Sequence, residues 1–185
     1  MIFYRYVRII LKQVEIIMKK EEGQQELLQK IGDNERIIFK ICHTYCINKT
    51  DREDLAQEII YQLLRSYHSY SGQFKFSTWM YRVSLNVAIS FYRKKSAKKE
   101  IYYQQRAHDL KEEINADKEL EENLIILEKY INELKELDKA LMLLYLESKS
   151  YQEIAEILGI TETNVATKVS RIKEILKRKF SAINT

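Results

Sequence analysis

Proline is absent from this chain of 185 residues, and glycine occurs only four times. Folds built from strands and tight turns need such residues at intervals of about 8–12 positions. The sequence therefore excludes an all-β fold and predicts an all-α one. Apolar residues make up 45% and charged residues 31%, so the chain is too apolar to be disordered throughout and too charged to lie within a bilayer. We expect a soluble helical protein.

Cysteine is also scarce. Cys42 and Cys46 lie four residues apart in a helical pattern, which excludes a disulfide framework and fits a reducing cytoplasm. His43 adjoins the pair, but the other histidines, His68 and His108, stand at no zinc-finger spacing from it. We therefore expect two buried thiols, no metal, no cofactor and a cytoplasmic location.

Long hydrophobic runs are missing as well. The first twenty residues are rich in Ile and aromatic residues, but basic residues and Glu15 interrupt them. Neither a secretory core of about 7–15 apolar residues nor a membrane span fits this pattern. Residues 1–17 are then an extra amphipathic helix, or a translated stretch upstream of a natural start at Met18. We favour the second, because Met18 opens the first segment that the remaining pattern needs.

No pattern of a catalytic site is found in the sequence. It contains no Ser/His/Asp or Cys/His set at a readable spacing and no phosphate-binding loop. Its paired carboxylates all lie in runs of mixed charge that are typical of a solvated surface. The chain is therefore not expected to be an enzyme.

Charge is segregated along the chain, although the formal net charge is only +4. Residues 82–99 and 168–179 are strongly basic, and an acidic stretch separates them. We predict two small helical domains, at 18–98 and 123–185, joined by an acidic linker at 99–122.

Capping residues and apolar periodicity give the expected helices. The N-terminal domain is predicted to contain helices over 24–31, 34–48, 51–67 and 77–95, with a loop over 66–74. The third of these opens with a capping box at 50–53. The C-terminal domain is predicted to contain helices over 124–134, 137–146, 150–158 and 161–180. There, Ser150 and Glu153 form a second capping box, Gly159 stops a helix and Thr161 caps the last one.

The C-terminal domain ends in a helix-turn-helix pattern, whose second helix lies in the major groove of DNA. Its expected apolar seam consists of Ile154, Ala155, Leu158, Ile160, Val165, Val169 and Ile172. Its outward face offers polar and basic side chains to base edges: Glu162, Thr163, Asn164, Thr167, Lys168, Ser170 and Arg171. Phosphate contacts are expected from Lys173, Lys177 and Arg178. The alternative, an ordinary amphipathic hairpin with a solvated basic face, is disfavoured by the spacing of the caps, Ala155 and Gly159.

Aromatic residues are interleaved with the first basic run. On a helix, Trp79, Arg82, Asn86 and Arg93 share one face, expected to face solvent, and Met80, Val83, Val87 and Phe91 share another, expected to be core. Rings to stack on, an amide for base edges and cations for the backbone are what unpaired bases need. The alternative is that the aromatics are mostly core and that the lysines merely suit a helix C-terminus. The pattern by itself leaves both open.

Three segments together resemble a known family: DREDLAQEII at 51–60, FSTWMYRVSLN at 76–86 and SYQEIAEILGI at 150–160. Their order, spacing and acidic linker are similar to those of bacterial RNA polymerase sigma factors, specifically the extracytoplasmic function (ECF) group of the sigma-70 family. The resemblance covers about 22–98 and 123–180. It implies a four-helix sigma region 2-like domain, a sigma region 4-like helix-turn-helix domain, and a transcription initiation factor that binds core RNA polymerase and promoter DNA.

The resemblance also implies roles for single residues. Core polymerase is expected to bind Asp54, Gln57 and Glu58. Melted −10 DNA is expected to contact Tyr70, Ser71, Gly72, Gln73, Phe74, Trp79, Arg82, Asn86 and Arg93, with Tyr70 lining a pocket for a flipped base that Asn86 reads. The −35 duplex is expected to contact Thr163, Asn164, Thr167, Lys168, Ser170, Arg171 and Lys173. Ala166 departs from the family's usual Arg or Lys, which shifts weight to Asn164, Lys168 and Ser170.

Two other interpretations remain at this point. The chain could be a stand-alone helix-turn-helix regulator that needs no core polymerase and uses its N-terminal bundle for sensing or dimerisation. It could also be an antagonist that binds polymerase without initiating transcription. The family often has an anti-sigma partner that masks both domains, and the sequence does not identify one.

Overall fold

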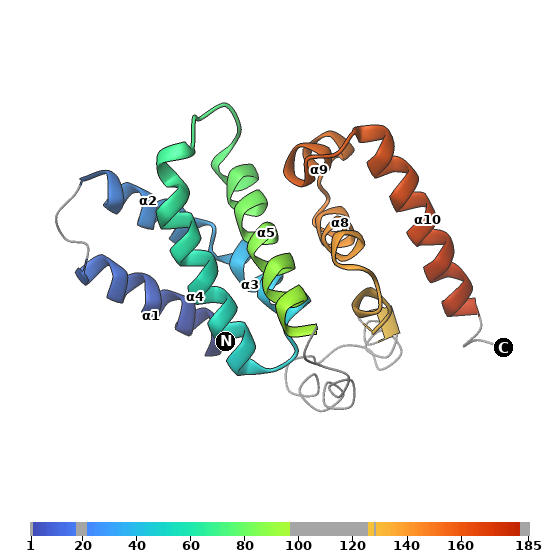
Figure 1. Cartoon of the computed structure of the whole chain (residues 1–185), viewed down its shortest axis with the longest axis horizontal. Coiled ribbons are helices and arrows are strands. Elements are labelled where there is room, and N and C mark those ends of the chain that lie inside the picture. Colours follow the sequence, from blue (N-terminus) through green and yellow to red (C-terminus); the bar gives the residue numbers. More distant parts are fainter. Residues whose placement is uncertain (1, 18–21, 97–125, 128, 182–185) are drawn as a thin grey trace. The chain divides into compact units, whose positions relative to one another are not determined.

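The computed structural model describes residues 2–17, 22–96, 126–127 and 129–181, and every regular element among them is a helix (Figure 1). The predicted all-α fold class is confirmed. The chain divides into two compact units, Met1–Lys98 and Lys99–Thr185. The expected acidic linker at 99–122 lies outside the described residues, and the finer domain bounds stay predictions. Within the described ranges, no helix is both long enough and apolar enough to cross a membrane.

The N-terminal unit is built around three mutually packed helices. Its elements are α1 (Ile2–Ile17), α2 (Glu22–Asp33), α3 (Glu35–Tyr45), α4 (Lys49–Ser66), the 3-10 turn η1 (Tyr67–Ser69) and α5 (Phe76–Ser96). Helices α3, α4 and α5 pack pairwise and supply most of the fully buried side chains, among them Ile38, Ile41, Leu55, Ile59, Leu63, Met80 and Leu85. Full burial of one such side chain contributes about 1.5–3 kcal/mol. This core therefore fixes the angle at which α5 leaves the loop.

Helix α1 packs on α2, α3 and α4. Its residues Phe3, Val7 and Leu11 recur every four positions and are all buried, as in an amphipathic helix. Arg8 donates hydrogen bonds of 2.7–3.1 Å to the carboxylate of Glu35, and these bonds raise the pKa of the guanidinium. The conformation is that of the extra amphipathic helix considered above. A natural start at Met18 stays a prediction.

The capping box expected at 50–53 is wrong. Helix α4 begins at Lys49, and its N-cap is Asn48, whose side-chain oxygen accepts a hydrogen bond of 2.8 Å from the backbone N–H of Asp51. Asn and Thr are both good N-caps, so the sequence offered two candidates two residues apart. The extended backbone at Asn48 decides between them. The preceding helix also ends earlier than expected, at Tyr45.

The two cysteines are buried thiols, as predicted. Burial raises the pKa of the Cys42 thiol well above its usual range, because desolvation disfavours the thiolate; nearby Cys46 raises the pKa further and Arg52 opposes the shift. Cys42 is therefore a protonated packing residue at neutral pH.

The C-terminal unit is a helix-turn-helix with a supporting helix. Residues 126–127 and 129–132, within the first expected helix, are helical, and α8 (Glu136–Leu146), α9 (Tyr151–Leu158) and α10 (Glu162–Ser181) follow. Three sequence predictions are confirmed. Ser150 and Glu153 form the capping box, Gly159 is left-handed with φ 67°, and Thr161 accepts a hydrogen bond from the N–H of Asn164 at 3.2 Å.

The apolar seam of this unit differs in part from the expected one. On α10, Val165, Val169 and Ile172 are buried as predicted, and Leu176 joins them. On α9 the buried residues are Ile154 and Ile157, whereas Ala155, Leu158 and Ile160 are only half-buried. The reason is that α9 contacts both α8 and α10, so its apolar stripe points between them and not at α10 alone.

Candidate nucleic-acid interface

Four aromatic rings meet where the chain passes from α4 through η1 into α5. The ring of Tyr70 lies 5.3 Å from that of Trp79, 5.7 Å from Phe76 and 6.1 Å from Tyr67. The Tyr70 hydroxyl donates a 2.8 Å hydrogen bond to the carbonyl of Phe74, which closes the loop on itself. Tyr70 and Trp79 are both half-buried. The four rings therefore support the loop. The alternative interpretation, in which these aromatic residues belong to the core, is thus correct in part.

The loop itself points into solvent. Ser71, Gly72, Gln73 and Phe74 are all exposed, and the Phe74 ring is 43% exposed. Gly72 has φ 74°, a conformation that costs glycine little and most other residues more. Figure 1 shows this loop at one end of the N-terminal unit, joining α4 to α5. An open ring on a braced loop is a surface on which an unpaired base can stack.

Helix α5 continues from this loop with a polar face. Arg82, Asn86 and Arg93 are exposed, as predicted. None of the three forms a hydrogen bond or ion pair with another described residue. Lys95 on the last turn is not open in this way. Its ammonium pairs with the Asp51 carboxylate and lies 4.8 Å from the centre of the Phe91 ring.

The predicted core face of α5 is wrong in part. Met80 is buried, but Val83, Val87 and Phe91 are only half-buried. The buried residues besides Met80 are Thr78, Tyr81, Ser84, Leu85 and Ala88. Because α5 packs against α3 and α4 together, its buried stripe is wider and rotated relative to the one drawn from spacing alone.

The surface expected to bind polymerase lies on α4. Asp54, Gln57 and Glu58 are all exposed there. The Gln57 amide donates to the hydroxyl of Tyr6, so α1 borders this surface. The exposed ring of Tyr61, one turn after Gln57, adds an apolar contact that the sequence analysis did not consider. The result is an acidic, amide-bearing face with one aromatic ring.

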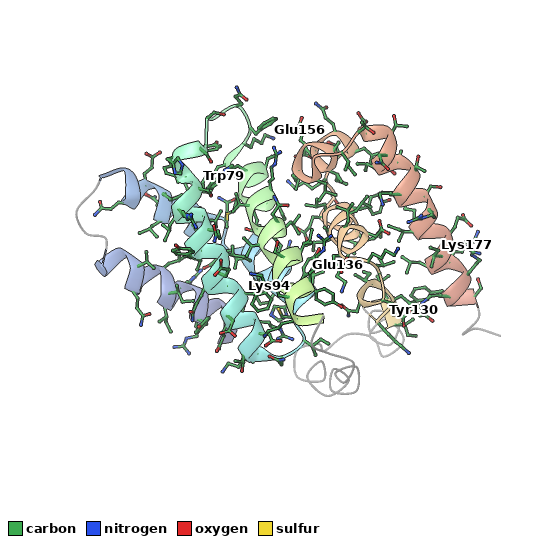
Figure 2. The ribbon with its side chains drawn as sticks, in the orientation of Figure 1. Trp79, Lys94, Tyr130, Glu136, Glu156 and Lys177 are labelled. Atoms are coloured by element: carbon green, nitrogen blue, oxygen red, sulfur yellow. The ribbon has the colours of Figure 1, made fainter. Side chains whose placement is uncertain are left out.

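Helix α10 presents most of its expected reading residues to solvent. Thr163, Asn164, Thr167, Ser170, Arg171 and Lys173 are exposed. Lys168 is the exception, with a side chain only 24% exposed. Further along, Lys177 is exposed and points away from the rest of its unit (Figure 2).

Three cations of α10 are held by residues of α8. Lys168 donates to one carboxylate oxygen of Asp138 at 2.9 Å, and Arg171 donates to the other at 3.2 Å. Lys173 donates to the hydroxyl of Tyr145 and lies 4.3 Å from the centre of its ring. The hydrogen bond raises the pKa of Lys173, which therefore keeps its charge at any physiological pH. Asp138 and Tyr145 were not predicted from the sequence, because they lie about thirty positions from the cations that they bind and no local pattern links them.

Comparison with known proteins assigns both units to one family. The family model Sigma-70 region 2 matches residues 31–98, and Sigma-70 region 4 matches residues 124–176. The ECF RNA polymerase sigma factor SigW of Bacillus subtilis is 28% identical over 187 positions, which cover 90% of this chain and 98% of SigW. The ECF RNA polymerase sigma-E factor of Haemophilus influenzae is 27% identical, covering 76% of this chain and 80% of that protein. SigV of Bacillus subtilis is 27% identical, covering 86% and 95%.

A solved structure supports the fold. A chain in the structure of CnrH in complex with the cytosolic domain of CnrY superposes with a TM-score of 0.63 at 17% identity, covering 96% of this chain and 98% of that one. The stand-alone regulator is not favoured, because the N-terminal unit matches a polymerase factor and not a sensing or dimerisation domain. The chain therefore belongs to the sigma-70 family of RNA polymerase sigma factors, in its ECF group, and is a transcription initiation factor that directs the polymerase to promoters.

Proposed function

We propose that the N-terminal unit captures the melted −10 element with its exposed loop and the polar face of α5, while α10 reads the −35 duplex. The observation that carries the proposal is the exposed Phe74 ring on a braced loop, followed on α5 by the open side chains of Arg82 and Asn86. Stacking contributes about 1–3 kcal/mol per base. Binding of this size, given only to the unpaired state, shifts the DNA toward melting.

Each group on this surface suits one part of a single strand. The Phe74 ring stacks on a base, the Asn86 amide bonds a base edge, and Arg82 and Arg93 attract the phosphates. Tyr70 would flank a flipped base with one edge of its ring, since its hydroxyl is held by the loop. The Trp79 ring packs against the Tyr70 ring and supports it.

Core polymerase is proposed to bind the acidic face of α4 formed by Asp54, Gln57 and Glu58. All three are exposed on one side of a helix whose opposite side is anchored in the core. Such a face complements a basic helical surface, and Tyr61 beside it supplies an aromatic anchor of the kind enriched at interfaces. The chain supplies no catalytic step in this scheme and acts in the cytoplasm, where the polymerase is.

CnrH was solved in complex with the cytosolic domain of CnrY. By analogy with that complex, we propose that an anti-sigma factor also binds this chain and blocks its polymerase contacts. A bound anti-sigma factor should then lower the affinity of the chain for core polymerase at least tenfold.

Footprinting of the holoenzyme on one of its promoters tests which unit binds which promoter element. We expect Asn86→Ala to reduce permanganate reactivity of thymines near −10, by less than loss of the Phe74 ring does, while the upstream footprint persists. The control is Gln25→Ala, which removes an exposed amide side chain on α2 and should change neither signal. Loss of core polymerase binding by Asn86→Ala would instead mean that the α5 face is misassigned.

A further inference from the structure

Asp138 lies on α8, outside the reading helix, and yet it binds two cations of that helix. We propose that Asp138 is a positioning residue that determines upstream promoter specificity: it orients Arg171 toward a base pair and withholds Lys168 from DNA. This inference rests on the proposed function of α10 as the −35 reader and adds to it the residue that sets the reader's geometry.

The carboxylate of Asp138 is well placed to hold other side chains in position. Its side chain is only 9% exposed, and each of its two oxygens accepts a hydrogen bond from a different cation. It also lies in the first turn of α8, where the helix dipole stabilises a negative charge. Hydrogen bonds between charged partners are the stronger kind, so the two cations are held in one arrangement.

The two cations are held to different degrees. Arg171 is 63% exposed and uses one nitrogen on Asp138. A guanidinium has five N–H donors, so the remaining ones can still form the two parallel bonds that recognise guanine in the major groove. The bond to Asp138 and base reading are therefore compatible, and fixing the guanidinium beforehand lowers the entropy lost on binding.

Lys168 is in the opposite position. Its side chain is 24% exposed, and its ammonium lies 2.9 Å from Asp138. Contact with a base or phosphate would require it to leave a shielded ion pair. The weight that Ala166 shifted to Lys168 therefore moves to Arg171, while Lys168 pairs with the other oxygen of Asp138 and contributes no DNA contact.

The proposal has a signature that a merely structural role lacks. Asp138 places a negative charge beside a surface that meets phosphates, so it weakens sequence-independent binding. Replacing it with the isosteric, neutral Asn should therefore lower sequence discrimination and at the same time raise affinity for random DNA. Loss of structure would lower both.

The experiment selects DNA with the holoenzyme, assembled from core polymerase and the full chain. The probe is a promoter duplex in which the upstream element is randomised, and bound molecules are sequenced to give the preference at each base pair. The variants are Asp138→Asn, Asp138→Glu, Arg171→Ala and Lys168→Met, with Lys129→Ala, an exposed cation outside α10, as the control for loss of a cation. Thermal unfolding of each variant is recorded beside the selection.

We expect Arg171→Ala to lower the preference at one base pair about tenfold, the effect of losing a bidentate contact. Asp138→Asn should weaken the preference at the same base pair about threefold and raise affinity for random duplex. Asp138→Glu keeps the charge but moves the carboxylate, so it should weaken that preference without raising random binding. Lys168→Met and Lys129→Ala should leave the pattern unchanged.

Two results separate failure of this inference from failure of the proposed function. If Arg171→Ala flattens one base pair while both Asp138 variants keep it, α10 is the reader and Asp138 has no positioning role. If Arg171→Ala changes no base pair, the assignment of α10 itself is wrong. Equal loss of preference at every base pair in Asp138→Asn and Asp138→Glu, with lower unfolding temperatures, would also overturn the proposal.

Discussion

The two units of this sigma factor differ in how they hold the cations of their proposed DNA-binding helices, α5 and α10. On α5, Arg82 and Arg93 are exposed and unbonded by any described residue. On α10, Lys168, Arg171 and Lys173 are each held by a side chain of α8. The N-terminal unit supports its aromatic loop with packed rings and leaves Arg82 and Arg93 without a partner among the described residues, whereas the C-terminal unit holds three cations of α10 in place.

The difference corresponds to the form of DNA that each unit is proposed to bind. A duplex has a regular groove with a fixed pattern of donors and acceptors, so side chains held in place beforehand lose less entropy on binding. A single strand has no fixed path, and long mobile cations can follow it while rings supply stacking that tolerates any base. Rigid recognition and adaptable capture thus arise from the same residue types in different surroundings.

The largest effect is expected at the exposed ring. Phe74→Ala removes a stacking surface worth about 1–3 kcal/mol, which is roughly a fivefold to 150-fold loss of open complex. Permanganate footprinting of the holoenzyme on a promoter measures it. The control is Tyr61→Ala, a second exposed ring on α4, which should weaken core polymerase binding and not melting. Equal melting by Phe74→Ala and the unmodified protein would remove the loop from the DNA contact.

A smaller effect is expected from loosening the loop. Tyr70→Phe keeps the ring contacts but deletes the 2.8 Å hydrogen bond to Phe74, a bond worth about 1 kcal/mol. We expect open-complex formation to fall about fivefold, and hydrogen exchange at 71–74 to rise. If melting falls while exchange does not change, the Tyr70 hydroxyl contacts DNA directly and does not act through the loop.

The salt dependence of binding distinguishes phosphate contacts from base contacts on α10. Lys173→Ala removes one phosphate contact, so the slope of log affinity against log salt should decrease by about 0.9 for every sequence tested. Tyr145→Phe deletes only the hydroxyl partner of Lys173 and should leave the slope unchanged. Titrations of holoenzyme with promoter and random duplex between low and moderate salt decide the matter. A sequence-dependent loss in Lys173→Ala would make Lys173 a base reader.

The smallest effect concerns pH and the buried thiol. The pKa of Cys42 is raised in the folded state, so its contribution to stability is complete below the unfolded value of about 8.5 and decreases as pH rises above it. The unfolding temperature of the N-terminal unit should therefore fall as the pH rises above about 8.5. Cys42→Ala should lower stability at neutral pH but flatten this dependence, and an unchanged profile would argue against a titrating Cys42.

Local patterns in the sequence predicted much of the fold and the candidate surfaces. The capping box at Ser150, the left-handed Gly159 and the exposed face of Arg82 and Asn86 each depend on residues within one or two turns. Such features follow from spacing alone. The helix-turn-helix was found for the same reason.

What the sequence did not predict depends on contacts between distant segments. Asp138 meets Lys168 across thirty residues, and the rotated stripe of α5 reflects two neighbouring helices at once. The N-cap of α4 was misassigned because Asn48 and Thr50 can both cap a helix, one through an amide oxygen and the other through a hydroxyl. In the first two cases packing, and not propensity, made the choice.

Run-off transcription with purified core polymerase, on pooled genomic fragments from the source of this chain, tests the central claim most directly. The account predicts discrete new start sites that depend on the added protein and share two upstream sequence elements. An absence of new transcripts while the protein still binds core polymerase would contradict it and favour an antagonist.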